Sequence, residues 1–228
     1  MRQIEMLRLG ALVAVLSVQS ASALSERPMA VDDAATLPRG GAKLEAGWSI
    51  DDEAGSAEFA AGYAPIEHLE FELGAARTRD AAPAPDEVAH AVGFVLKWVP
   101  LQAETGLSAG LKFSYERARG DVQERVQSLT GLLSWRFDSG VGLHLNAGRE
   151  RVDPQGACAD VYATWGVGAD FPIAPRWQLT LETVGAEGSG PDRQVGVRYQ
   201  LADGLKLSAA VGRGNRRSLA NVGIAWEF

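Results

Sequence analysis

The chain has 228 residues, a formal net charge of −7 and a single cysteine. An acidic chain without a clustered basic stripe is a poor partner for nucleic acid, and one cysteine cannot form a disulfide framework within one chain. The length permits one domain or two small ones, and no Pro-rich or Ser-rich linker divides the sequence, so we expect one folded domain.

Residues 1–23 have the pattern of a secretory signal peptide. Two arginines precede an apolar run at residues 9–18, and small residues follow at 21–23, as at a cleavage site. The apolar run is shorter than the roughly 20 residues of a helix that spans a bilayer. We therefore expect export through a cleaved signal peptide, and no transmembrane helix.

Residues 24–41 show neither helical nor strand periodicity. Their sequence, LSERPMAVDDAATLPRGG, contains prolines, adjacent acids and a glycine pair, all of which interrupt regular structure. We expect this segment to be an ordered periplasmic lead-in or a short plug.

From Lys43 to the last residue, apolar and polar side chains alternate with a period of two. This period indicates strands, because successive side chains in a strand point to opposite faces. The alternating runs are residues 43–50, 58–63, 69–75, 92–98, 107–116, 128–137, 141–148, 160–171, 177–182, 195–201, 205–211 and 219–228. We therefore predict about twelve strands within residues 42–228.

The connections between these runs fall into two groups. Those after even-numbered strands, such as 138–140 and 202–204, are short, whereas most of those after odd-numbered strands, such as 78–87, 117–124 and 151–158, are longer and more charged. Outer-membrane barrels have short periplasmic turns and longer extracellular loops. The pattern predicts an all-β fold, a transmembrane antiparallel up-and-down β-barrel in a bacterial outer membrane.

A soluble β-sandwich with one face of each strand in a core is the alternative fold. Every predicted strand has one apolar face and one face with charged or small residues. Unpaired charges buried between two sheets cost several kcal/mol each. Inside a barrel the charges can pair with one another and with water, while the apolar face meets lipid and the closed sheet satisfies the backbone.

The tryptophans support the barrel. All six fall on the apolar face, and four lie close to a short turn or to the carboxy terminus, where an indole ring would sit at the lipid interface. The final aromatic residue resembles the signal that the outer-membrane assembly machinery reads. The predicted aromatic girdle consists of Trp48, Trp98, Trp135, Trp177, Trp226 and Phe228.

The opposite face is predicted to line the lumen. Its residues are Lys43, Glu45, Glu58, Glu70, Glu72, Lys97, Lys112, Glu116, Arg136, His144, Asn146, Asp160, Asp170, Glu182, Arg198 and Lys206. Acids outnumber bases, so a water-filled lumen would prefer cations or neutral solutes. A closed interior held by structural ion pairs is the alternative, since barrels of 8 strands are filled whereas those of about 16 contain a channel.

Few residues could carry catalysis or bind a metal. Ser134, His144 and Asn146 could lie together as a hydrolytic group, but they face the lumen, whereas a phospholipid would arrive from outside. His68 and His90 lie far from His144 in the sequence. We expect no enzyme, no metal and no cofactor.

Two further motifs favour ordinary surface roles. Cys158 has no neighbouring base to activate its thiol. The string GRGNRRS at residues 212–218 joins two predicted strands and lacks the helix and the Gly-Lys-Ser/Thr ending of a phosphate loop. Arg213, Arg216 and Arg217 could instead contact lipopolysaccharide phosphates, although a solvated charge cluster is the commoner explanation.

The lead-in RPMAVDDAATLPRGGAKLEAGW, the paired amphipathic strands and the terminal aromatic together resemble the small outer-membrane barrels of the phenol meta-degradation pathway transporter type. The resemblance implies a barrel and the passage of small solutes, hydrophobic or aromatic compounds among them. The expected partners are outer-membrane lipids, lipopolysaccharide, the assembly machinery and small solutes. The alternative function is a non-conducting structural or surface-interaction barrel whose extracellular loops bind a partner.

Overall fold

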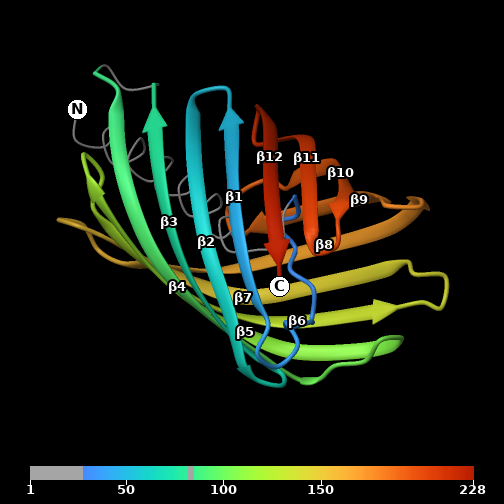
Figure 1. Ribbon diagram of the computed structural model, residues 1–228. Helices are drawn as coiled ribbons and strands as arrows, with labels where there is room; N and C mark the ends of the chain where they lie inside the picture. Colours follow the sequence, from blue (N-terminus) through green and yellow to red (C-terminus); the bar gives the residue numbers. More distant parts are fainter. Residues whose placement is uncertain (1–27, 82–84) are drawn as a thin grey trace.

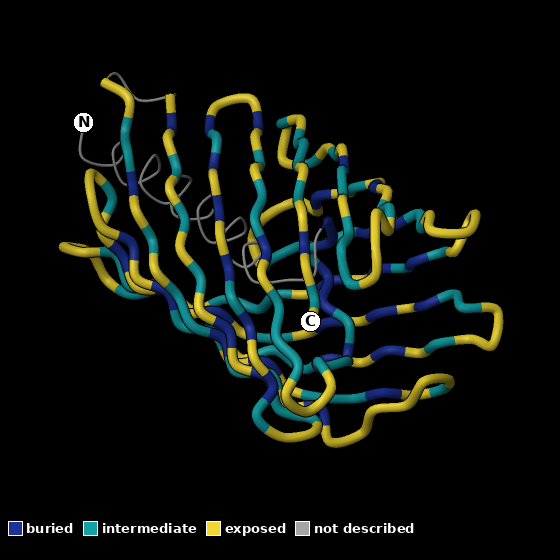
Figure 2. The backbone as a smooth tube through the Cα atoms, in the orientation of Figure 1, coloured by how far each residue is buried: buried dark blue, intermediate teal, exposed yellow. Residues whose placement is uncertain are grey.

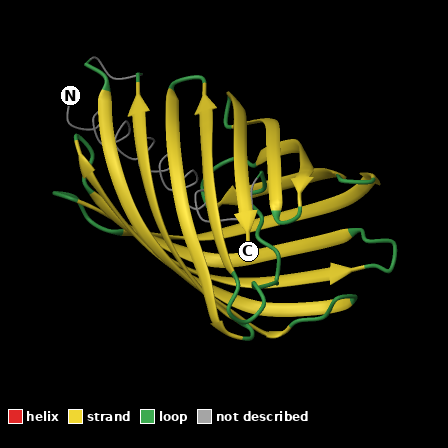
Figure 3. Ribbon diagram, viewed as in Figure 1, coloured by secondary structure: helices red, strands yellow, loops and turns green. Residues whose placement is uncertain are grey.

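The protein is a closed barrel of twelve antiparallel strands (Figure 1). The computed structural model describes residues 28–81 and 85–228, so the expected signal peptide lies outside the described residues. The strands are β1 (Ala42–Asp51), β2 (Ala54–Ile66), β3 (Leu69–Asp80), β4 (Glu87–Leu101), β5 (Gly106–Gly120), β6 (Glu124–Arg136), β7 (Gly142–Pro154), β8 (Asp160–Ala174), β9 (Trp177–Ala186), β10 (Asp192–Ala202), β11 (Leu205–Gly214) and β12 (Arg217–Glu227). The described residues contain no helix that could cross a membrane (Figure 3).

Each strand pairs with its sequence neighbours, and β12 closes the ring by pairing with β1. Ala42 and Phe228 exchange two backbone hydrogen bonds at this seam, of 2.8 and 2.9 Å. The seam leaves no sheet edge, as a barrel requires. The fold thus confirms the predicted all-β barrel, and the soluble sandwich is wrong.

The barrel has two rims. The C-terminal rim contains Ala42, Phe228 and the turns that follow even-numbered strands; the distal rim contains the hairpins that follow odd-numbered strands. The hairpin between β11 and β12 has positive φ at both central residues, Asn215 and Arg216. This is the conformation of a type I′ turn, whose twist matches that of the flanking strands.

Burial alternates along the strands in the opposite sense to that of a soluble protein (Figure 2). Most large apolar side chains are exposed on the outer surface, whereas many buried residues are charged or polar. The largest fully buried side chains among the described residues are only Val99 and Val152. The interior is therefore a polar lumen with small apolar patches.

The strands continue further toward the distal rim than the alternation indicated. β5 extends to Gly120, β6 begins at Glu124 and β7 reaches Pro154, although residues 117–124 and 151–158 were expected to be loops. Charged residues on the outward positions interrupt the apolar pattern in these parts without interrupting the strands.

Candidate functional site in the barrel lumen

Residues 28–41, here called the N-terminal segment, run through the lumen (Figure 1). The segment has almost no regular structure, so its backbone groups need partners, and the barrel wall supplies them. Glu182 on β9 accepts hydrogen bonds from the N–H groups of Ala30 and Val31, at 2.8 Å each for its Oε2. The first part of the segment is therefore anchored to one wall side chain.

The middle of the segment is held by two strands on the other side of β8. Asn146 on β7 bonds Asp32 twice: its Oδ1 accepts the Asp32 N–H and its Nδ2 donates to the Asp32 carbonyl, both at 2.8 Å. Ser134 Oγ on β6 accepts the Ala34 N–H at 2.8 Å. Asn146 thus gives the Asp32 backbone the two hydrogen bonds that a neighbouring strand would provide in a sheet.

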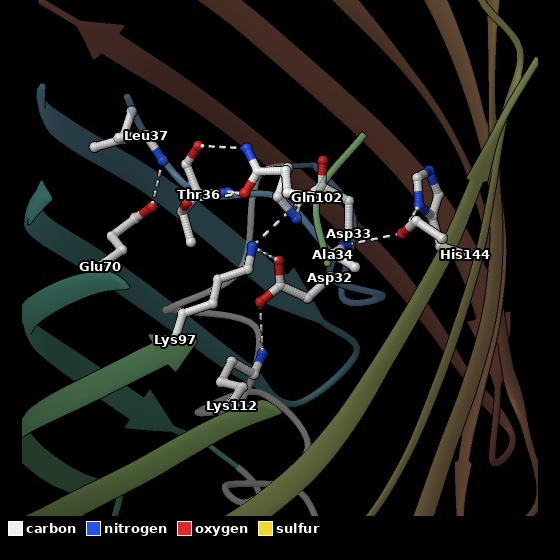
Figure 4. Close-up of polar contacts among 12 residues, drawn as sticks. Asp32, Asp33, Ala34, Thr36, Leu37, Glu70, Lys97, Gln102, Lys112 and His144 are labelled. Atoms are coloured by element: carbon white, nitrogen blue, oxygen red, sulfur yellow. Dashed lines mark hydrogen bonds and ion pairs between the residues drawn. The ribbon is translucent and has the colours of Figure 1, made fainter. Parts of the chain in front are cut away.

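Asp32 also anchors the segment by charge (Figure 4). Its carboxylate lies 2.8 Å from Lys97 Nζ on β4 and 3.0 Å from Lys112 Nζ on β5, and Lys97 also reaches Asp33 at 3.2 Å. Burial alone would raise the pKa of Asp32, but the ammonium groups of Lys112 and Lys97 outweigh it and hold this pKa well below its ordinary value. Asp32 is therefore a buried carboxylate that stays ionised.

The end of the segment contacts the C-terminal rim (Figure 4). Leu37 donates its N–H to Glu70 on β3 at 3.0 Å, and Thr36 donates to Gln102 in the turn after β4. Glu70 in turn contacts Lys43, whose ammonium lies 2.9 Å from Glu70 and 2.6 Å from Glu72. The wall charges at this rim thus pair with one another and with the segment.

Ser134, His144 and Asp170 form a relay in the wall. Ser134 Oγ lies 2.9 Å from His144 Nδ1, and His144 Nε2 lies 2.7 Å from Asp170 Oδ1. A histidine protonated on Nε2 donates to Asp170 and accepts the Ser134 hydroxyl proton, which leaves Ser134 Oγ as the acceptor for Ala34. Although Ser, His and Asp also form hydrolytic triads, here the serine is covered by the N-terminal segment, so the relay serves docking.

Cavities lie in the lumen beside the segment, and two of them are defined by their lining residues. One of about 500 Å³ opens between the segment and the C-terminal rim, where Lys43, Asp170 and Arg198 are among its lining residues. The other, of about 100 Å³, lies toward the distal rim and is lined by Glu116, Glu150 and others. Ala30 and Val31 of the segment contribute to one cavity each.

Three carboxylates gather near the distal rim, on adjacent strands. Glu116 on β5, Glu124 on β6 and Glu150 on β7 are all buried on the inner side. Both carboxylate oxygens of Glu124 are without a hydrogen-bond partner among the described residues. Further along this rim, Arg217 bonds Asp51 at 2.9 Å and Asp192 at 3.1 Å.

The structure places most of the sequence-derived lumen residues on the inner side. Those that are buried are Glu45, Glu58, Glu70, Glu72, Lys112, Glu116, His144, Asn146, Asp170 and Glu182. Lys43, Lys97, Arg136, Arg198 and Lys206 are partly exposed near the C-terminal rim or the segment, whereas Asp160 is exposed at the distal rim. Asp51, Glu124, Glu150 and Asp192 could not be assigned from the sequence, because they lie toward strand ends, where the alternation fades. Arg217, considered there as a lipopolysaccharide contact, instead pairs with Asp51 and Asp192.

The aromatic girdle residues are exposed on the outer surface: Trp48, Trp98, Trp135, Trp177, Trp226 and Phe228. Near the C-terminal rim, Trp177 stacks against Tyr199 and Trp226 against Phe228, both with ring centroids 4.6 Å apart. Trp48 lies instead toward the distal end of β1.

The remaining candidates lie apart. Cys158 is an exposed free thiol in the hairpin after β7. His68 is in the turn after β2 and His90 is on the outer side of β4. No group of three or more His, Cys, Asp or Glu residues in the described part of the chain could hold a metal ion.

The fold resembles solved bacterial outer-membrane barrels. The KdgM porin in complex with disordered oligogalacturonate is 14% identical with a TM-score of 0.63, over 82% of this chain and 99% of that chain. The COG4313 outer membrane channel from Pseudomonas putida F1 is 11% identical with a TM-score of 0.64, over 86% and 98%. The NanC porin is 7% identical with a TM-score of 0.62, over 81% and 98%.

At these identities the likeness shows the fold, which is that of porins and channels. No protein with a curated description matches the chain. A family model described as "Uncharacterised conserved protein UCP029691" matches residues 11–226, nearly the whole sequence. The chain therefore belongs to the UCP029691 family.

Proposed function

We propose that the protein is a passive channel for small solutes in the bacterial outer membrane, and that the N-terminal segment closes its lumen. The observation that carries the proposal is the docked N-terminal segment. This irregular stretch of chain crosses a polar lumen and leaves a cavity of about 500 Å³ open toward one rim.

The proposed orientation follows from the chain path. Both described ends of the barrel, Ala42 and Phe228, lie at the C-terminal rim, which in outer-membrane barrels is periplasmic. The distal rim then faces the cell surface. The proposal includes export through the signal peptide at residues 1–23, insertion by the assembly machinery, and contact of the outer surface with lipid and lipopolysaccharide.

The proposed selectivity is for cations and neutral solutes. Acids are more numerous than bases on the inner side, and Glu124 lacks a partner among the described residues. Oligogalacturonate, the ligand of the KdgM complex, is an anion, so this lumen does not suit the same solute. The resemblance to phenol-pathway barrels suggests uncharged hydrophobic or aromatic compounds.

Conductance of the full chain in a planar bilayer tests the proposal. We expect discrete current steps in KCl, with a cation preference that decreases in Glu70→Gln, because Glu70 lies between Lys43 and the N-terminal segment at the C-terminal rim. Glu104→Gln, in an exposed turn of the same rim, is the matched control. A folded protein that never conducts would contradict the proposal.

The second candidate is a non-conducting barrel with a structural or surface-binding role. The observation in its favour is the same docking, because wall charges such as Lys97 and Lys112 are already paired by Asp32. It predicts silent bilayers for the native chain and for variants whose segment is released.

A further inference from the structure

The outer surface carries a group of positively charged side chains near the distal rim, and they have no contact with the lumen. On the strands from β3 to β7, outward positions near the distal rim carry arginines. The members of this arginine band are Arg77, Arg117, Arg119, Arg125, Arg149 and Arg151, all exposed. The buried carboxylates of the same strands, such as Glu116, Glu124 and Glu150, face the lumen.

The band is continuous from β3 to β6, whereas Arg149 and Arg151 on β7 lie opposite Leu129 and Gln127. Arg117 is directly opposite Arg125, and His90 lies between Arg77 on one side and Arg119 on the other. Side chains directly opposite each other in an antiparallel sheet lie about 5 Å apart at Cβ, and like charges in such pairs destabilise the sheet. Opposed arginines therefore lower the stability of the sheet unless an anion binds between them, which points to an anionic ligand.

The chain itself supplies little compensation. Among residues 28–81 and 85–228, no ion pair connects any of the six arginines to a carboxylate; a seventh, Arg79, pairs with Asp86. Asp153 is opposite Arg125 in the register, but a single carboxylate cannot neutralise the charges of several arginines. The band therefore presents uncompensated positive charge to whatever surrounds the barrel.

The height of the band defines its surroundings. Further along the same strands, toward the C-terminal rim, lie exposed apolar side chains such as Leu73, Leu111 and Leu133. An arginine on the lipid-facing side of a barrel is costly at the middle of the bilayer and nearly free at the interface. The change from Leu to Arg thus marks the level at which hydrocarbon ends and head groups begin.

We infer that the arginine band is a binding site for a phosphorylated lipid of the surrounding leaflet, with phosphate groups held between β3 and β7. Guanidinium groups bind phosphate through two parallel hydrogen bonds, which makes arginine the suitable residue. The two strands that flank the band carry uncharged residues at the positions opposite it: Ala57 on β2 lies opposite Arg77, and Val161 on β8 lies opposite Arg151. A smaller group of exposed arginines consists of Arg193 and Arg213, which are opposite each other on β10 and β11, and Arg216 in the turn after β11.

The inference rests on the proposed orientation, in which the distal rim faces the lipopolysaccharide leaflet, and it does not depend on conduction. Its test is binding of diphosphoryl lipid A to the full chain in detergent, measured by native mass spectrometry. For Arg117→Gln/Arg125→Gln we expect binding about thirtyfold weaker, since each arginine near an anionic lipid surface contributes about a factor of five. A heat-modifiable band on an unboiled gel verifies that the variant is folded.

The comparison variant is Arg193→Gln/Arg213→Gln, which removes two directly opposite arginines near the distal ends of β10 and β11. Because Arg213 could itself contact a lipid A phosphate, this variant should lose far less binding than Arg117→Gln/Arg125→Gln, rather than none. Equal losses in both variants would overturn the site, as would undiminished binding of lipid A from which the phosphates have been removed. If millimolar inorganic phosphate displaced lipid A completely from the protein, the band would be a site for free phosphate, and the inferred lipid site would be wrong. Conductance of the same variants is measured in parallel, so that a failure of the channel proposal can be told apart from a failure of the lipid-binding site.

Discussion

The carboxylate of Asp32 lies between two lysines of the barrel wall, at 2.8 and 3.0 Å. Replacing it by asparagine keeps the shape of the side chain but leaves both ammonium groups in the interior without this anion. Loss of one partner of a buried ion pair costs about 3 to 5 kcal/mol. In Asp32→Asn we therefore expect the docked segment to release, with a rise of at least tenfold in the open fraction of single-channel recordings.

The control for this prediction is Asp86→Asn, which removes an exposed ion pair with Arg79. Exposed pairs contribute about 0 to 1 kcal/mol, so the open fraction should stay that of the native chain. An unchanged open fraction in Asp32→Asn would mean that this ion pair does not hold the lumen closed.

Glu124 provides a second prediction for a single residue. It is buried near the distal rim beside Glu116 and Glu150, and its carboxylate oxygens have no partner among the described residues. When it is ionised, a carboxylate at this position attracts cations into a lumen. Glu124→Gln should lower the cation-to-anion permeability ratio, measured as the reversal potential in a KCl gradient. Glu104→Gln, exposed at the other rim, should leave that potential as it is.

At the level of the element, the N-terminal segment depends on glycines of the wall. A Cβ at Gly168 on β8 would lie 2.5 Å from Met29 Cε and 3.1 Å from Val31 Cβ. Cβ atoms essentially never lie 2.5 Å from another heavy atom, so the end of the Met29 side chain must move, and Val31 must shift slightly as well. Gly168→Val should therefore increase the open fraction while the barrel remains folded.

Gly131→Ala is the matched glycine control. A Cβ at Gly131 would meet only the Ala147 carbonyl oxygen, at 3.5 Å, an ordinary contact. The segment should stay docked and the open fraction should not change. If both glycine variants behave alike, the segment does not depend on the space at Gly168.

The strands and the inward or outward direction of their side chains could be predicted from the sequence, because a period of two is a local property. Strand ends could not: at Arg117 and Arg119 the outward residues become charged while the backbone ladder continues to Gly120. The docking contacts could not be predicted either, since Asp32 and Asn146 are 114 residues apart in the sequence. Only closure of the ring brings them together.

At the scale of the whole molecule, the closed ladder gives the protein its stability. The outer surface is apolar and the lumen polar, so no packed hydrophobic core is present among the described residues, and every backbone group exposed to lipid must be satisfied within the sheet. The seam between β1 and β12 is the step that completes this ring. Its pairing should therefore decide whether the barrel forms.

Val222 on β12 tests this dependence, because it lies opposite Trp48 of β1 and Ala209 of β11 with its side chain outside. Val222→Pro removes a ladder N–H in the closing strand, and an unsatisfied backbone group in lipid costs several kcal/mol. We expect this variant to lose the fast-migrating form that a folded barrel shows on an unboiled gel. Val222→Ala removes only exposed methyl groups and should keep that form; its loss in both variants would mean that side-chain contacts with Trp48, and not backbone pairing, hold the seam.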